Sequence, residues 1–116
     1  IFIGTATDGD IIQTNLDLNG NIDKSAINIS KIDEKMYDFT LISEKTSRET
    51  YFEYKGASRE YILSKKFLIE KCKQFDMYPI RILSFHEWNK IYNGNLMSKE
   101  EMACSFLNFS FVFQKY

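Results

Sequence analysis

Few residues in this sequence could do chemistry by themselves. His86 is the single histidine, and neither a second histidine nor closely spaced cysteines accompany it. Cys72 and Cys104 are too few and too far apart for a disulfide framework or a four-ligand zinc site. We interpret both cysteines as buried, reduced thiols and His86 as a helix-start or surface residue. We therefore expect neither a bound metal nor a nucleophilic catalytic side chain.

A polar segment near the start of the chain is a second candidate. The apolar run Ile1–Thr5 is typical of a buried strand, and the sequence Asp-Gly-Asp at 8–10 follows it. A strand buried on both faces predicts a central place in a parallel sheet, where ligands bind just beyond the carboxyl ends of the strands. Residues 5–10 are then expected to meet a ligand. The alternative is that Asp8 or Asp10 caps a helix.

The elements that must position these residues differ along the chain. Residues 15–24 are rich in Asn, Asp and Gly, which predicts a turn-dense excursion. Period-two alternation predicts antiparallel strands over 26–32, 36–42 and 50–54. Beyond them we expect an extended segment at 59–63, a helix over 65–75 capped by Ser64, a strand over 78–85, short helices over 86–92 and from 98, and a closing strand over 106–113. The 65–75 helix is expected to bury one face, made of Phe67, Leu68, Cys72 and Phe75.

Length and composition limit what these elements can form. At 116 residues with 44% hydrophobic and 27% charged residues, the chain has the composition of one soluble domain. A net charge of −1 excludes binding to nucleic acid through bulk positive charge, so such a role would be local. The sequence has no membrane-length apolar run, no secretory signal and no Gly-rich cofactor turn. Its start on Ile1, in mid-strand, leads us to expect half of a larger fold.

Five segments resemble, in the same order, those of messenger-RNA cap guanine-N7 methyltransferases. Residues 1–5 are similar to the family's F-I-G-T strand, and residues 7–10 to the D-G-D form of poxvirus-type enzymes. Residues 37–41 resemble the Y-D-F-x-L strand, and residues 60–63 the Glu followed by an aromatic and aliphatics. Residues 97–101 with 111–115 resemble the terminal L-S-K-x-E…V-F-x-F-x-K. The likeness covers nearly the whole chain and is greatest to the methyltransferase module of large-DNA-virus capping enzymes.

The resemblance implies a fold class and a place in a longer enzyme. It implies an α/β chain that forms the C-terminal half of a Rossmann-like class I S-adenosylmethionine-dependent methyltransferase fold, with an antiparallel β insertion. Residues 1–116 would be the cap-binding part of that domain. The N-terminal half, which binds most of S-adenosylmethionine, would precede Ile1, so this chain alone is expected to be inactive. Triphosphatase and guanylyltransferase modules could lie further upstream.

The reaction implied is methyl transfer from S-adenosylmethionine to N7 of the cap guanine. It needs no metal and no nucleophilic side chain, because N7 carries its own lone pair and the sulfonium is already activated. Catalysis is then alignment in a favourable electrostatic setting. A carboxylate suits the guanine, since N1–H and N2–H lie side by side on its Watson–Crick edge and one carboxylate can accept both.

Two residues match the family's guanine contacts in this half of the domain. Glu60 occupies the position of the guanine-holding Glu; the alternative is an exposed charge on a strand edge, paired with Arg59 or Lys65. Asn108 stands where the family has a Tyr on the closing strand, which is a departure. Either Asn108 makes a polar contact with the guanine, or Phe106 supplies the aromatic surface.

Three further residues are expected at the edge of this site. Lys55 and Arg59 flank Glu60 in a locally basic stretch and would meet the cap triphosphate or RNA. Tyr37 would form part of the pocket wall, although an aromatic residue on an alternating strand is also typical of ordinary packing.

The resemblance also implies partners and location. These are the capped mRNA 5′ end and the upstream part of the enzyme, without a membrane; the need for a stimulatory subunit stays open. The location would be cytoplasmic for a viral enzyme, in the viral factory or virion, or nuclear for a cellular one. Two alternatives remain: a non-catalytic methyltransferase-like subunit that binds a catalytic partner through an exposed sheet edge, and an unrelated α/β interaction module.

Overall fold

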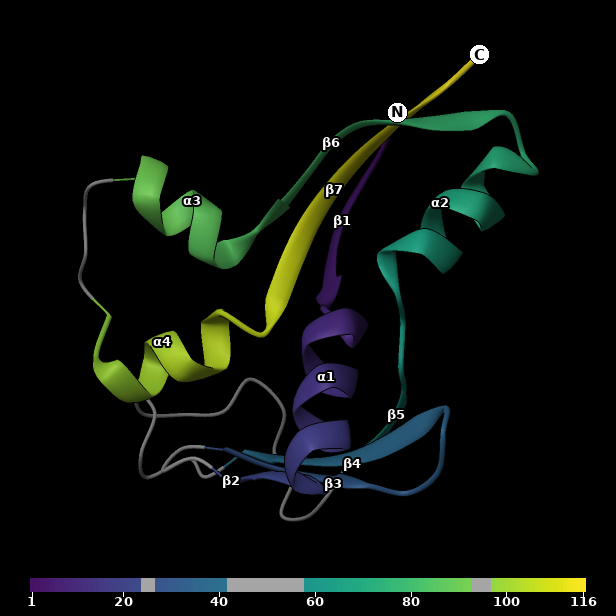
Figure 1. Ribbon diagram of the computed structural model, residues 1–116. Helices are drawn as coiled ribbons and strands as arrows, with labels where there is room; N and C mark the ends of the chain where they lie inside the picture. The colour runs from purple at the N-terminus through teal and green to yellow at the C-terminus, as the bar shows by residue number, and fades with distance from the viewer. Residues whose placement is uncertain (24–26, 42–57, 93–96) are drawn as a thin grey trace.

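The computed structural model describes residues 1–23, 27–41, 58–92 and 97–116 (Figure 1). In these residues two antiparallel sheets combine with helices. The elements in chain order are β1 (Phe2–Thr7), α1 (Gly9–Asn19), β2 (Asn21–Asp23), β3 (Ile27–Lys31), β4 (Met36–Leu41), β5 (Ser58–Tyr61), α2 (Lys65–Lys73), β6 (Met77–Ser84), α3 (Phe85–Ile91), α4 (Lys99–Ser105) and β7 (Asn108–Lys115).

The first sheet has the strand order β1-β7-β6, with β7 antiparallel to both neighbours. Because β1 and β6 lie on opposite sides of β7, they run in the same direction. Alternate residues of β7, Phe109, Phe111 and Phe113, are buried with Cys72 of α2. Strand β7 therefore supplies the core of this sheet, which α2 covers.

The second sheet has the order β2-β3-β4-β5, again with antiparallel neighbours. Its core contains Ile22, Ile29 and Tyr37, and Ile12 and Leu16 of α1 pack against them. Figure 1 shows α1 leading from the end of β1 to this sheet. Helix α1 is thus the packed connection between the two sheets.

Backbone hydrogen bonds join the start of α1 to two other parts of the chain. Asp8 N–H donates to the Leu107 carbonyl over 2.7 Å, just before β7, and Gly9 N–H donates to the Leu63 carbonyl over 2.9 Å, just after β5. A Cβ atom on Gly9 would lie 2.2 Å from that carbonyl oxygen. Only glycine permits this approach, so Gly9 fixes the distance between α1 and the segment that follows β5.

The expected Rossmann-like parallel sheet is wrong, because every strand pair that the structure describes is antiparallel. The expectation came from the resemblance to the methyltransferase family, and the apolar run at the start of the chain agreed with a central parallel strand. That run forms an edge strand instead, with Ile1 82% and Ile3 69% exposed. Asp8 caps α1: its Oδ1 accepts from Asp10 N–H at 3.1 Å and Ile11 N–H at 3.4 Å. The capping alternative is therefore correct for Asp8.

Of the other local predictions, some are confirmed and some are wrong. The turn-dense excursion at 15–24 is wrong for its first half, because α1 continues to Asn19 and ends at Gly20, whose φ is +77°. The Ser64-capped helix, the following strand and both short helices are confirmed within one or two residues of their expected starts. Phe67 and Phe75 of the expected apolar face are exposed, whereas Cys72 is buried. The strand expected at 50–54 lies outside the described residues.

Candidate functional site

Glu60 and Tyr37 lie directly opposite each other on adjacent strands. They are register partners in the antiparallel β4–β5 ladder, so their side chains project from the same face of the sheet. Strand β5 is the edge of this sheet. Tyr37 is 1% exposed, while Glu60 is half-buried. Glu60 therefore lies at a rim, with one side against a buried phenol and the other open to solvent.

Thr7 connects Tyr37 to the other sheet. The Tyr37 phenol makes a hydrogen bond with the Thr7 side chain. Thr7 is the last residue of β1 and is the register partner of Asn108, the first residue of β7. We name Thr7, Tyr37, Glu60 and Asn108 the junction cluster. It links three residues selected from the sequence through pairwise contacts: Tyr37 lies opposite Glu60, and Thr7 connects Tyr37 to Asn108.

The electrostatics of the junction cluster follow from burial. Burial raises the pKa of the Glu60 carboxyl above its ordinary value of 4.5. The pKa of Tyr37 is also raised, first by burial and then by the negative charge of Glu60, while the hydrogen bond with Thr7 opposes the increase. Glu60 affects the Tyr37 pKa because the two side chains lie opposite each other on the same face of the sheet. The cluster therefore holds a partly desolvated carboxylate beside a neutral phenol.

Neither cation proposed as a partner of Glu60 pairs with it. Arg59 donates from Nε to Asp38 Oδ1 over 3.0 Å, and these two residues are register partners on the other face of the β4–β5 ladder. Lys65 donates from Nζ to Asp8 Oδ2 over 2.6 Å. In the described part of the chain, no ion pair neutralises the Glu60 carboxylate, so the alternative of a paired surface charge is not seen here.

Asn108 has a clear structural contact. Its Nδ2 donates to the carbonyl oxygens of Cys104 and Ser105, both over 3.1 Å. These donations satisfy the end of α4, whose last carbonyls have no partner within the helix. The amide oxygen of Asn108 remains as the group that could accept a bond from a ligand. Phe106 ends α4 with its ring 4.8 Å from that of His86, so it packs on α3.

The remaining site predictions are placed less centrally. Arg59 projects away from Glu60 and is occupied by Asp38. Lys55 lies outside the described residues. Thr7 lies within residues 5–10, which were expected to meet a ligand, but it was not selected individually as a site residue. Lys65 was missed as the partner of Asp8, and no sequence pattern relates two residues that far apart.

Within the ranges given above, His, Cys, Asp and Glu side chains form no group of three or more that could hold a metal ion. Cys72 and Cys104 are both free thiols, the first buried and the second half-buried. None of the described helices has the length and apolar character needed to cross a membrane.

Comparison of the sequence with models of known protein families found no matching family, and comparison with curated proteins found no match. The resemblance to cap methyltransferases therefore depends on the five motifs themselves. The geometry of the junction cluster is the independent observation against which a function can be argued.

Proposed function

We propose that this chain supplies guanine-binding contacts in an mRNA cap guanine-N7 methyltransferase, with the Glu60 carboxylate as the principal contact. The observation that carries the proposal is a half-buried carboxylate with no cation partner in the described residues, at the junction of the two sheets. This proposal concerns side chains, and it does not depend on the parallel sheet that the structure lacks.

An unpaired, partly desolvated carboxylate is a costly group to keep for stability alone. Burial penalises its charged form, and no cation among the described residues offsets the penalty. Guanine offers two adjacent N–H donors, so a bound base would satisfy both oxygens of the Glu60 carboxylate. The N–H donors of the bound base would replace the hydrogen bonds to water that the Glu60 carboxylate loses on burial.

The junction cluster also offers the means to orient such a base. Tyr37 is too buried to stack on a ligand, but it lies against Glu60 and fixes one side of the carboxylate. Asn108 is held by two donations to the end of α4, which leave its amide oxygen free to accept from a second edge of the ligand. Two fixed acceptors from different strands would align N7 toward a methyl donor.

S-adenosylmethionine would be bound by an upstream part of the same enzyme, and the capped 5′ end of mRNA would be the substrate. When bound, the sulfonium supplies the activated methyl group, and the guanine N7 lone pair accepts it. The role of the described residues is to hold the base. Cytoplasmic action, or nuclear action in a cellular enzyme, accompanies this assignment.

The test is a titration of the protein with GTP, with ATP for comparison because adenine lacks the paired N–H donors. Glu60→Gln should weaken GTP binding about 10- to 100-fold, which is the loss expected for a hydrogen bond to a charged group. Glu34→Gln is the matched control, since it removes the same charge from an exposed turn. Equal binding of GTP by wild type and Glu60→Gln contradicts the proposal, as does unchanged methyl transfer by the complete enzyme carrying Glu60→Ala.

A second candidate is a non-catalytic subunit that binds a protein partner through the free edge of β1. The observation in its favour is the exposure of Ile1 and Ile3 on that edge strand. This function makes no use of Glu60. A charge introduced by Ile3→Glu should abolish partner binding and leave GTP binding unchanged, whereas Glu60→Gln should do the reverse if guanine binding is the function.

A further inference from the structure

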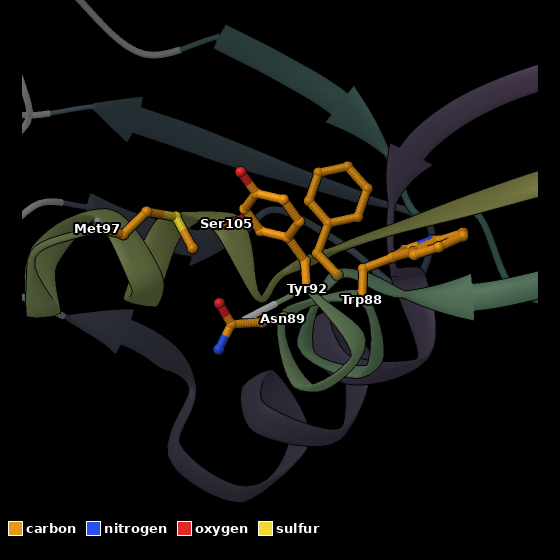
Figure 2. Close-up of a pocket in the computed structure, with 6 residues that line it drawn as sticks. Trp88, Asn89, Tyr92, Met97 and Ser105 are labelled. Atoms are coloured by element: carbon orange, nitrogen blue, oxygen red, sulfur yellow. The ribbon is translucent and has the colours of Figure 1, made fainter. Parts of the chain in front are cut away.

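A pocket opens between α3 and α4. It has a volume of about 320 Å³. Four of its lining residues are aromatic or thioether side chains, and the other two are an amide and a hydroxyl. The lining consists of Phe85, Trp88, Asn89, Tyr92, Met97 and Ser105. Figure 2 shows Asn89 and Tyr92 of α3 between Met97, on the α4 side, and the ring of Trp88, which extends to the other side.

The Trp88 side chain of this pocket is held in place before any ligand arrives. Trp88 Nε1 donates to Ser110 Oγ over 2.6 Å, and Ser110 Oγ donates to the Leu83 carbonyl over 3.2 Å. The Arg81 guanidinium lies 5.9 Å from the centre of the Trp88 ring. These contacts tie α3 to β6 and β7. A rigid aromatic surface loses little conformational freedom when a flat ligand stacks on it.

One hydrogen bond connects the pocket to the junction cluster. Ser105 lines the pocket, and its carbonyl accepts the hydrogen bond from Asn108 Nδ2. Asn108 in turn is the register partner of Thr7. A ligand that contacts Asn108 therefore lies beside a residue that lines this pocket.

The chemistry of the lining selects a flat heteroaromatic ring. Aromatic side chains stack on any nucleobase, and an Asn amide offers a donor and an acceptor side by side, as a base edge requires. The charges of the two helices and of β6 beside them balance, with Arg81, Lys90 and Lys99 against Glu87, Glu100 and Glu101. No excess of positive charge is present there to hold phosphates, so the base would enter and the backbone would stay outside.

We propose that the α3–α4 pocket takes the base of the nucleotide that adjoins the cap guanine, by stacking against Trp88 and Tyr92 with Asn89 at its edge. This inference rests on the proposed function, because it places the first transcribed base beside a guanine held at Glu60. It extends the site from recognition of one base to recognition of a capped dinucleotide.

Trp88 makes the test direct, because it is the single tryptophan of the chain and lines the pocket. Its fluorescence is followed while the protein is titrated with GTP and with a capped dinucleotide, guanosine joined through a triphosphate to adenosine. The dinucleotide should quench Trp88 and bind about tenfold more tightly than GTP, the gain expected for one stacked base.

Tyr92→Ala should remove this gain and leave GTP binding unchanged. Tyr92 is 70% exposed, so its truncation spares the core. Phe75→Ala is the matched control, an aromatic residue that is 65% exposed at the end of α2, and it should preserve the gain. Asn89→Ala should lower the affinity for the dinucleotide without weakening that for GTP.

The outcomes separate the two proposals. If GTP binding depends on Glu60 but the dinucleotide binds no more tightly than GTP, the pocket inference fails and the proposed function stands. If neither guanine ligand binds, the proposed function fails, and a titration with AMP decides the pocket alone. Quenching of Trp88 by AMP that Tyr92→Ala abolishes supports a base-binding pocket; absence of quenching overturns it and leaves an apolar contact for a protein partner.

Discussion

The ammonium nitrogen of Lys65 lies 2.6 Å from Oδ2 of Asp8, a carboxylate that is 1% exposed. Asp8 caps α1 and Lys65 is the first residue of α2, so this contact joins the beginnings of two helices. Lys65 was one of two expected partners of Glu60, and in the structure it is bonded to Asp8 instead.

Asp8→Ala and Asp8→Asn should destabilise the protein by different amounts. Alanine loses both the helix cap, about 1 kcal/mol, and the charge-assisted bond with Lys65, about 1.5–3 kcal/mol. Asparagine keeps the cap and loses only the second contribution. Lys65 is about one-third exposed and can reach water, so the loss should stay below that of a fully buried ion pair. Urea unfolding of both variants measures these losses. If Asp8→Asn unfolds at the same urea concentration as wild type, the ion pair between Asp8 and Lys65 contributes nothing to stability.

Gly9→Ala should cost more than Gly20→Ala. At Gly9 the added Cβ would meet the Leu63 backbone, which cannot yield without moving the segment after β5, and we expect a loss of about 2–3 kcal/mol. At Gly20 the positive φ strains alanine by about 1 kcal/mol, but the space around it is open. Thermal unfolding of the two variants tests the order. Because the displaced segment follows β5, Gly9→Ala should also weaken GTP binding, and Gly20→Ala should not.

Stability and guanine binding should respond to pH in opposite directions at Glu60. The Glu60 pKa in the folded state is raised above 4.5, the ordinary value that applies to the unfolded state. At a pH between the two pKa values the folded state binds more protons than the unfolded state, so stability falls as pH increases. Glu60→Gln removes this loss and should be more stable than wild type at pH 7, with the difference vanishing below pH 4.5. GTP binding by wild type should instead strengthen as pH rises through the Glu60 pKa, because the carboxylate is the accepting form. If stability and GTP binding changed with pH in the same direction, the role of Glu60 as the guanine contact would be contradicted.

Asn108→Asp should destabilise the protein more than Asn108→Ala. Aspartate cannot donate to the carbonyls of Cys104 and Ser105, and its negative charge is repelled by the end of α4. Alanine loses only the donations, at about 1 kcal/mol. Hydrogen exchange at the amides of α4 and chemical denaturation provide the measurement. Greater stability of the aspartate variant would mean that Asn108 does not cap α4.

Local signals in the sequence were sufficient for many elements. The Ser64 cap and the Ser98–Glu101 capping box lie where the side-chain pattern predicts them, because capping depends on residues within one turn of each other. The selection of Glu60, Tyr37 and Asn108 came from motif positions. The pairing of β4 with β5 places Glu60 opposite Tyr37, and Asn108 pairs with Thr7 in the other sheet. Their proximity itself could not be predicted from the sequence, since it depends on which strands pair.

The failures arise where a local pattern is compatible with more than one tertiary setting. The run Ile1–Ile3 is apolar both in a central strand and in an exposed edge strand, and only the neighbour on its far side distinguishes them. In the same way, Asn and Asp residues at 15–19 favour turns, but burial of Leu16 against the second sheet stabilises a helix there. Propensity is weaker than packing in both cases.

Strand β7 is the last strand in sequence order and the middle strand of its sheet. The pairing of Phe2 with Phe113 closes a loop that contains nearly the whole chain, and such distant contacts slow folding. During synthesis, β1 and β6 would wait unpaired until β7 leaves the ribosome. Asn108 opens β7, so the proposed guanine site would be complete only after β7 has paired with β1 and β6.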